Sequence, residues 1–183
     1  MPQHRDLPAV ARNPEGVVFD LDGVLCDTEP LWLEARDEVA DEVGGKIVQD
    51  DYLRFYGANT AQWSVAMAEI LGHPDPSWIG ERTIDALLSR YRAGRVRPIV
   101  AGVAAVRRAA ARGPIAIASG SPPQAIATLL EILRLDDVVA TYVSCDEVPA
   151  GKPAPDVYLE ACRRIGIDPT RDRKSTRLNS SHT

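Results

Sequence analysis

FDLDGVLCDTE, residues 19 to 29, places Asp20 and Asp22 two positions apart, directly after an apolar run and directly before Gly23. Acidic residues are poor strand formers and are costly to bury without a partner. Side chains two positions apart on an extended chain point the same way, so both carboxylates can face one site. Two like charges held this close repel each other, so a partner must keep them there.

In the rest of the sequence, short apolar segments alternate with longer segments whose apolar residues have helical spacing. Short apolar runs rich in β-branched residues or alanine are typical of buried parallel strands, and they occur at 16–21, 115–119 and within 138–145. Helical spacing bounded by proline and glycine predicts helices at 30–43, 60–71, 77–93, 103–112, 122–133 and 153–165. We therefore expect an α/β fold, with a Rossmann-like parallel sheet and helices on both faces.

A helical block interrupts this pattern directly after the first strand, because residues 30 to 94 carry no strand signal. We interpret the block as an inserted helical cap. The predicted divisions are a first part of the core at 14–29, the cap at 30–96, the remainder of the core at 97–171 and a tail at 172–183.

The tail begins with DRKSTRLNSSH, residues 172 to 182, which has no apolar periodicity. A disordered terminus is one interpretation. The interpretation we prefer is a non-native segment, because these residues match the translation of a common sequencing adapter. On that hypothesis the native sequence breaks off near Arg171, and the core as written is incomplete at its C-terminus.

The composition limits the classes of function. With 45% hydrophobic and 26% charged residues, the chain is typical of globular proteins. Its formal charge of −5 argues against nucleic acid or an anionic membrane as a partner, and no apolar stretch is long enough to span a bilayer. The three cysteines form no CxxC pair, which indicates neither a disulfide framework nor a zinc site. We expect a cytoplasmic protein that is a monomer or a weak dimer.

Three polar signals follow the expected strands. They are Asp20-x-Asp22-Gly23, Ser119-Gly120-Ser121 and Gly151-Lys152-Pro153. Each alone is more often an ordinary turn or helix cap. Ligands of parallel α/β sheets bind beyond the carboxyl ends of the strands, so the order and placement of the three together predict one site.

The residue types at this site favour an anion held beside a cation. Ser119 and the Gly120 amide can donate hydrogen bonds to an anion at the start of a helix, and Lys152 can supply a positive charge. Carboxylate oxygens are ligands that Mg²⁺ prefers, and Mg²⁺ commonly joins phosphate sites. Thr28 stands at the start of the first helix. Gly57, in the cap loop, either marks a close backbone approach to substrate or has no such role.

The motifs DLDGVLCDTE, IAIASGS and GKPAPDVY resemble those of the haloacid dehalogenase superfamily, in the branch of phosphatases and β-phosphoglucomutase-like proteins. The resemblance covers roughly residues 16 to 169. It implies that Asp20 is the nucleophile of an aspartyl-phosphate mechanism and that Asp22 is the general acid and base. The Asp20 carboxylate and the Asp22 carbonyl would bind Mg²⁺.

The same resemblance implies that the phosphate lies among Ser119, Gly120, Lys152 and Thr28, and that the substrate is a small phosphorylated metabolite. A sugar phosphate or phosphoglycolate is the expected class. The presence of Asp22 favours phosphoryl transfer over dehalogenation.

Two departures from the family pattern keep alternatives open. The fourth, acidic motif that completes the metal site has no match, so we expect residues 1–183 to be poorly active and marginally stable. The mutase relatives carry a histidine where this chain reads Glu29-Pro30-Leu31-Trp32 and an arginine near the cap loop, which this chain lacks. The leading hypothesis is therefore a phosphatase, and the alternatives are a phosphosugar mutase and a non-catalytic fragment.

Overall fold

The computed structural model describes residues 15–55 and 57–169. Its strands are β1 (Val17–Phe19), β2 (Cys26–Asp27), β3 (Arg97–Pro98), β4 (Ile115–Ser119) and β5 (Thr141–Ser144). Its α-helices are α1 (Glu29–Glu42), α2 (Thr60–Leu71), α3 (Pro76–Arg92), α4 (Val100–Ala110), α5 (Pro123–Ile132) and α6 (Asp156–Arg164). Two short 3₁₀ helices are η1 (Gln49–Arg54) and η2 (Cys145–Glu147). The prediction of an α/β fold with an inserted helical region is confirmed.

The main sheet is parallel and has the strand order β1-β4-β5. Phe19 pairs with Ile117 across the first pair of strands, and Ser119 pairs with Ser144 across the second. All three strands therefore end at the same edge of the sheet. This register brings the segments that follow Phe19, Ser119 and Ser144 together.

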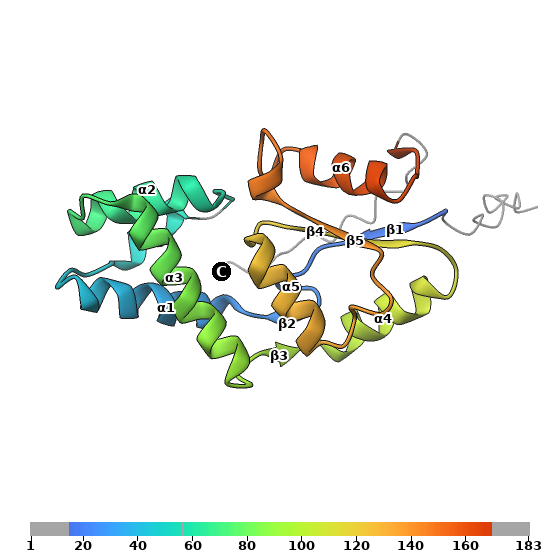
Figure 1. Ribbon diagram of the computed structural model, residues 1–183, viewed down its shortest axis with the longest axis horizontal. Helices are drawn as coiled ribbons and strands as arrows, with labels where there is room; N and C mark the ends of the chain where they lie inside the picture. Colours follow the sequence, from blue (N-terminus) through green and yellow to red (C-terminus); the bar gives the residue numbers. More distant parts are fainter. Residues whose placement is uncertain (1–14, 56, 170–183) are drawn as a thin grey trace, which may run out of the picture.

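Both faces of this sheet are covered, as Figure 1 shows: α6 lies on one face, and α4 and α5 lie on the other. Every residue of β4 is buried, which explains why its sequence IAIAS shows no polar alternation. Ile115 and Ile117 belong to the larger hydrophobic cluster, which also includes residues of α5. Ala116 and Ala118 point to the opposite face and pack with residues of α6.

Helices α1, α2 and α3 form the helical insertion, which lies beside the sheet in Figure 1. The chain enters it after β2 and leaves it at β3, and these two strands pair antiparallel, Cys26 with Pro98 and Asp27 with Arg97. The sequence analysis did not predict this ribbon. Within the insertion, α3 packs on both α1 and α2.

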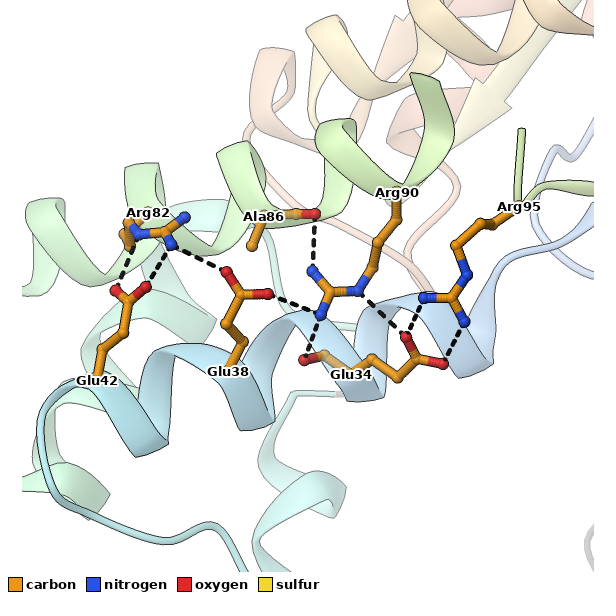
Figure 2. A network of polar contacts seen from close by, with 7 residues as sticks. All are labelled: Glu34, Glu38, Glu42, Arg82, Ala86, Arg90 and Arg95. Carbon is orange, nitrogen blue, oxygen red and sulfur yellow. Dashed lines mark hydrogen bonds and ion pairs between the residues drawn. The ribbon is translucent and has the colours of Figure 1, made fainter. Parts of the chain in front are cut away.

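A row of ion pairs joins α1 to α3 and the residues that follow it (Figure 2). Glu34, Glu38 and Glu42 are spaced four residues apart, so their side chains lie on one face of α1. Their partners are Arg82, Arg90 and Arg95; Arg90 contacts Glu38 at 2.8 Å and Arg95 contacts Glu34 at 2.5 Å. We call these six residues the glutamate–arginine ladder.

No helix within residues 15–55 and 57–169 has the length and apolar character needed to cross a membrane. All three cysteines are buried, and no disulfide joins any two of them.

Candidate active site

Asp20 is the first residue after β1, at the edge of the sheet where the strands end. Its Oδ1 accepts a hydrogen bond from the Leu21 amide at 2.8 Å and one from the Lys152 ammonium at 2.7 Å. The Asp20 side chain is still 35% exposed. Asp20 is thus a carboxylate that is oriented by a cation and remains accessible to a ligand.

Lys152 comes from the loop between η2 and α6, and reaches across the ends of two strands. Besides Asp20, its ammonium donates to the Ala118 carbonyl at 3.0 Å and lies 5.1 Å from the centre of the Tyr158 ring. Burial disfavours the charged ammonium, but the Asp20 carboxylate and the Tyr158 side chain together outweigh that effect, so the pKa of Lys152 lies above its ordinary value. Lys152 therefore stays positively charged beside Asp20 at neutral pH.

Asp22 has different surroundings from Asp20, because three hydroxyl groups donate to its carboxylate. Thr28 donates to Oδ1 at 2.5 Å, while Ser119 and Ser121 donate to Oδ2 at 3.0 and 2.9 Å. Thr28 and Ser119 are almost fully buried. These contacts hold the Asp22 carboxylate in one orientation next to Asp20.

The turn after Asp22 depends on Gly23, whose φ of 73° lies in the left-handed region. The Gly23 amide donates to the Cys26 carbonyl at 2.8 Å, which closes the turn and leads the chain into β2. Burial, reinforced by the charges of Asp22 and Asp27, raises the pKa of the Cys26 thiol. Cys26 therefore stays protonated and packs as a small apolar side chain.

The structure brings most of the sequence-predicted residues to one place. Asp20 and Lys152 are in contact, and Thr28 and Ser119 both reach Asp22. Gly120 is exposed, with open space where a side chain would begin. The phosphate-binding roles assigned to Ser119, Gly120, Lys152 and Thr28 remain predictions.

Ser121 is the residue whose role the sequence analysis missed. It was noted within the Ser119-Gly120-Ser121 motif, but no function was assigned to it. Its hydroxyl donates to Asp22, its amide donates to the Ser119 hydroxyl at 3.0 Å, and its carbonyl accepts from the Ser144 hydroxyl at 2.7 Å. The sequence signal that could have pointed to this role is the second serine, two positions after Ser119.

The groups that could hold a metal here are oxygens. Within the described part of the chain, no cluster of three or more His, Cys, Asp or Glu side chains could form a metal site. The Asp20 carboxylate and the Asp22 main-chain carbonyl are hard donors of the kind Mg²⁺ accepts, and Mg²⁺ needs only one or two carboxylates when phosphate and water complete its shell. The donor chemistry therefore fits Mg²⁺.

An accessible aspartate paired with a lysine lies at the strand ends of a parallel α/β sheet, where ligands of such sheets bind, so the fold and site fit an enzyme of the α/β class. Residues 14–171 match the model of the haloacid dehalogenase-like hydrolase family. The chain belongs to this family and is one of its phosphohydrolases.

The chain is similar to particular phosphatases and to a solved structure of the same fold. The chain is 30% identical over 161 residues to hexitol phosphatase B of Escherichia coli, covering 83% of this chain and 70% of the relative. It is 31% identical to the fructose-1-phosphate phosphatase YqaB of Escherichia coli, covering 85% and 82%. The crystal structure of CbbY from Rhodobacter sphaeroides in complex with phosphate has a TM-score of 0.71 at 21% identity, covering 86% of this chain and 75% of that one.

Proposed function

We propose that this protein is a Mg²⁺-dependent phosphatase that hydrolyses a small phosphate monoester through an aspartyl-phosphate on Asp20. One observation carries the proposal: Asp20 is accessible and paired with Lys152 at 2.7 Å, while neighbouring Asp22 is held by three hydroxyls. Two carboxylates in different surroundings suit two different chemical roles.

In the first step an Asp20 carboxylate oxygen attacks phosphorus, and the bond from phosphorus to the ester oxygen breaks. Asp22 gives its proton to the leaving oxygen. In the second step water attacks the same phosphorus, Asp22 takes the proton from that water, and the bond from Asp20 to phosphorus breaks. Inorganic phosphate leaves and Asp20 is regenerated.

Electrostatics supply most of the stabilisation in this scheme. Lys152 offsets the negative charge that gathers around Asp20 and the phosphoryl oxygens. Ser119 and the Gly120 amide are proposed to contact those oxygens. The Asp20 carboxylate and the Asp22 carbonyl would hold Mg²⁺, which when bound neutralises phosphate charge.

The substrate class comes from the relatives. Hexitol phosphatase B and the fructose-1-phosphate phosphatase are named for sugar phosphates, and a further relative is a phosphoglycolate phosphatase. We propose a sugar phosphate or phosphoglycolate as the substrate, and the helical insertion as the cap that covers it and excludes water.

The deciding experiment measures release of inorganic phosphate from hexitol phosphates, fructose 1-phosphate and phosphoglycolate in the presence of Mg²⁺. We expect turnover of at least one ester and its loss in Asp20→Asn, which keeps the size of the side chain and removes the nucleophilic carboxylate. Asp136→Asn, at an exposed position between α5 and β5 and outside the three motifs, is the matched control and should keep full activity.

Other outcomes point elsewhere. Conversion of one sugar phosphate into another without net phosphate release would indicate a mutase. Absence of turnover at high Mg²⁺ with every ester would favour a non-catalytic fragment. Retained activity in Asp20→Asn would show that Asp20 is not the nucleophile.

A further inference from the structure

A direct contact joins the helical insertion to the core away from Asp20 and Asp22. The Asp146 carboxylate, on η2, accepts one hydrogen bond from the Thr60 amide and another from the Thr60 hydroxyl, both at 2.7 Å. Thr60 is the first residue of α2. The first amides of a helix have no partner within it and carry partial positive charge, so a carboxylate is favoured there.

The helix already has its own cap, and Asp146 adds to it. Asn59 is the N-cap of α2, and its side chain accepts from the Gln62 amide at 2.9 Å. Asp146 takes a different amide, that of Thr60. The contact therefore links two parts of the molecule that are 86 residues apart, and α2 has no need of it to begin.

A second contact lies at the same junction. Gly57 has φ of 74°, and a side-chain carbon added to it would lie 2.8 Å from the Lys152 carbonyl. A carbon added to Gly151 would lie 3.3 Å from the Gly57 carbonyl. The backbone of residues 57–60, which we call the junction loop, thus lies directly on the loop that supplies Lys152.

Asp146 is itself tied to the catalytic residues through the backbone of its turn. Its amide donates to the Ser144 hydroxyl at 3.1 Å, and that hydroxyl donates to the Ser121 carbonyl at 2.7 Å. Ser121 in turn donates to Asp22. The Asp146 carboxylate therefore presents a fixed docking point whose position is set by the active-site loops.

We propose that Asp146 is a positioning residue that fastens the junction loop over Lys152 and so holds the helical insertion closed on the phosphorylated substrate. This role rests on the proposed phosphatase function. Asp146 is exposed, and hydrogen bonds at the surface are weak enough to form and break in each catalytic cycle. Asp146 acts through Thr60 and does not touch the reacting atoms.

The test uses the full chain with Asp146→Ala and Asp146→Asn. We expect the Thr60 amide to exchange with solvent about tenfold faster in Asp146→Ala, measured by NMR. The KM of the ester that the wild-type protein hydrolyses should rise about fivefold, with kcat within about twofold. Asp146→Asn keeps one acceptor oxygen and should fall in between.

Thr60 variants show whether Asp146 acts through this residue. Thr60→Ser keeps both donors and should match the wild-type KM, whereas Thr60→Val loses the hydroxyl and should raise it. The double variant Asp146→Ala with Thr60→Val should be no worse than Asp146→Ala alone. The control is Asp136→Ala. Asp136 is exposed, lies in the α/β part of the molecule outside the insertion, and has no hydrogen bond among the described residues. Its replacement should change neither the exchange of the Thr60 amide nor KM.

Unchanged exchange of the Thr60 amide in Asp146→Ala would overturn the proposal, and so would faster exchange with an unchanged KM. If no ester is hydrolysed, the phosphatase assignment fails separately, and affinity for fructose 1-phosphate, measured by calorimetry, replaces KM. An affinity about fivefold weaker in Asp146→Ala than in the wild-type protein would then support the positioning role. Equal affinities in the two proteins, or no detectable affinity in the wild-type protein, would overturn it.

Discussion

At the scale of single residues, the two aspartates differ in what surrounds them. Asp20 faces a cation and solvent, while Asp22 is enclosed by hydroxyl groups. A hydroxyl donor fixes the direction in which a carboxylate points, and proton transfer depends on that direction. We therefore expect the serine and threonine partners of Asp22 to matter to the proposed reaction, although none of them is expected to react.

Ser121→Ala removes one of the three donors to Asp22 while leaving Asp20 and Lys152 in contact. We expect kcat to fall about tenfold, because Asp22 is less well oriented for proton transfer. KM should change little. Ser89→Ala, an exposed serine of α3, is the control for the loss of a hydroxyl. A Ser121→Ala enzyme with the wild-type kcat would contradict the orienting role.

Tyr91 offers a prediction about stability. Its side chain is 1% exposed, and among the described residues its hydroxyl has no hydrogen-bond partner. Burial raises the pKa of the Tyr91 hydroxyl, which therefore stays protonated. A buried polar group without a partner destabilises the folded state. Tyr91→Phe should therefore raise the free energy of unfolding by about 1 kcal/mol, measured by urea denaturation. A lower free energy of unfolding would mean that the hydroxyl is satisfied in solution.

The residues that carry the site could be predicted only in part. Asp20, Asp22, Ser119 and Lys152 follow strands that the sequence marks clearly, so their meeting followed from the rule for parallel sheets. The hydrogen bond from Ser121 to Asp22 joins residues 99 positions apart, and the Thr60–Asp146 contact joins residues 86 apart. Such pairs depend on side-chain directions that no local pattern encodes.

At the scale of elements, local sequence signals were enough to predict a helix or a strand where the segment is periodic and bounded by turn residues. Helix α2 was predicted at 60–71 and is found at Thr60–Leu71, ending at Gly72 with φ of 65°. Strand β4 was predicted at 115–119 and is found there. The ribbon of β2 and β3 was missed because two-residue strands have no periodicity, and their pairing is decided by how the insertion folds.

We expect the glutamate–arginine ladder to make the stability of the insertion depend on pH. The hydrogen bond from Arg95 lowers the pKa of Glu34, and the hydrogen bond from Arg90 lowers the pKa of Glu38. For a carboxyl with a lowered pKa, the added stability is present above its unfolded value of 4.5 and is lost as the pH falls through the folded value.

Glu38→Gln should therefore lower the melting temperature at pH 7, and the difference from wild type should shrink towards zero near pH 3. Thermal unfolding of both proteins between pH 3 and pH 7 measures this difference in melting temperature. Glu81→Gln, an exposed position on α3, should show no such dependence. A difference that is the same at pH 7 and pH 3 would mean that ionisation of Glu38 contributes nothing.

At the scale of the whole molecule, the proposed reaction requires a divalent cation that links core and substrate. Treatment with EDTA should abolish phosphate release, because two carboxylates and a phosphate cannot gather without neutralising charge. Added Mg²⁺ should restore it, whereas Ca²⁺, which is larger and takes more ligands, should restore less. Phosphate release that survives complete chelation would contradict a role for the cation.

The ribbon of β2 and β3 has a consequence for how such a molecule can be altered. Because Cys26 lies opposite Pro98, the chain enters the insertion and leaves it at neighbouring points. We therefore expect the positions of β1 and β4 not to depend on how many residues lie between β2 and β3. Such a layout lets the helices of the insertion be lengthened, shortened or exchanged for those of another protein while Asp20 and Asp22 stay in place, so we expect that the proposed reaction could be directed to new compounds by grafting a single continuous segment.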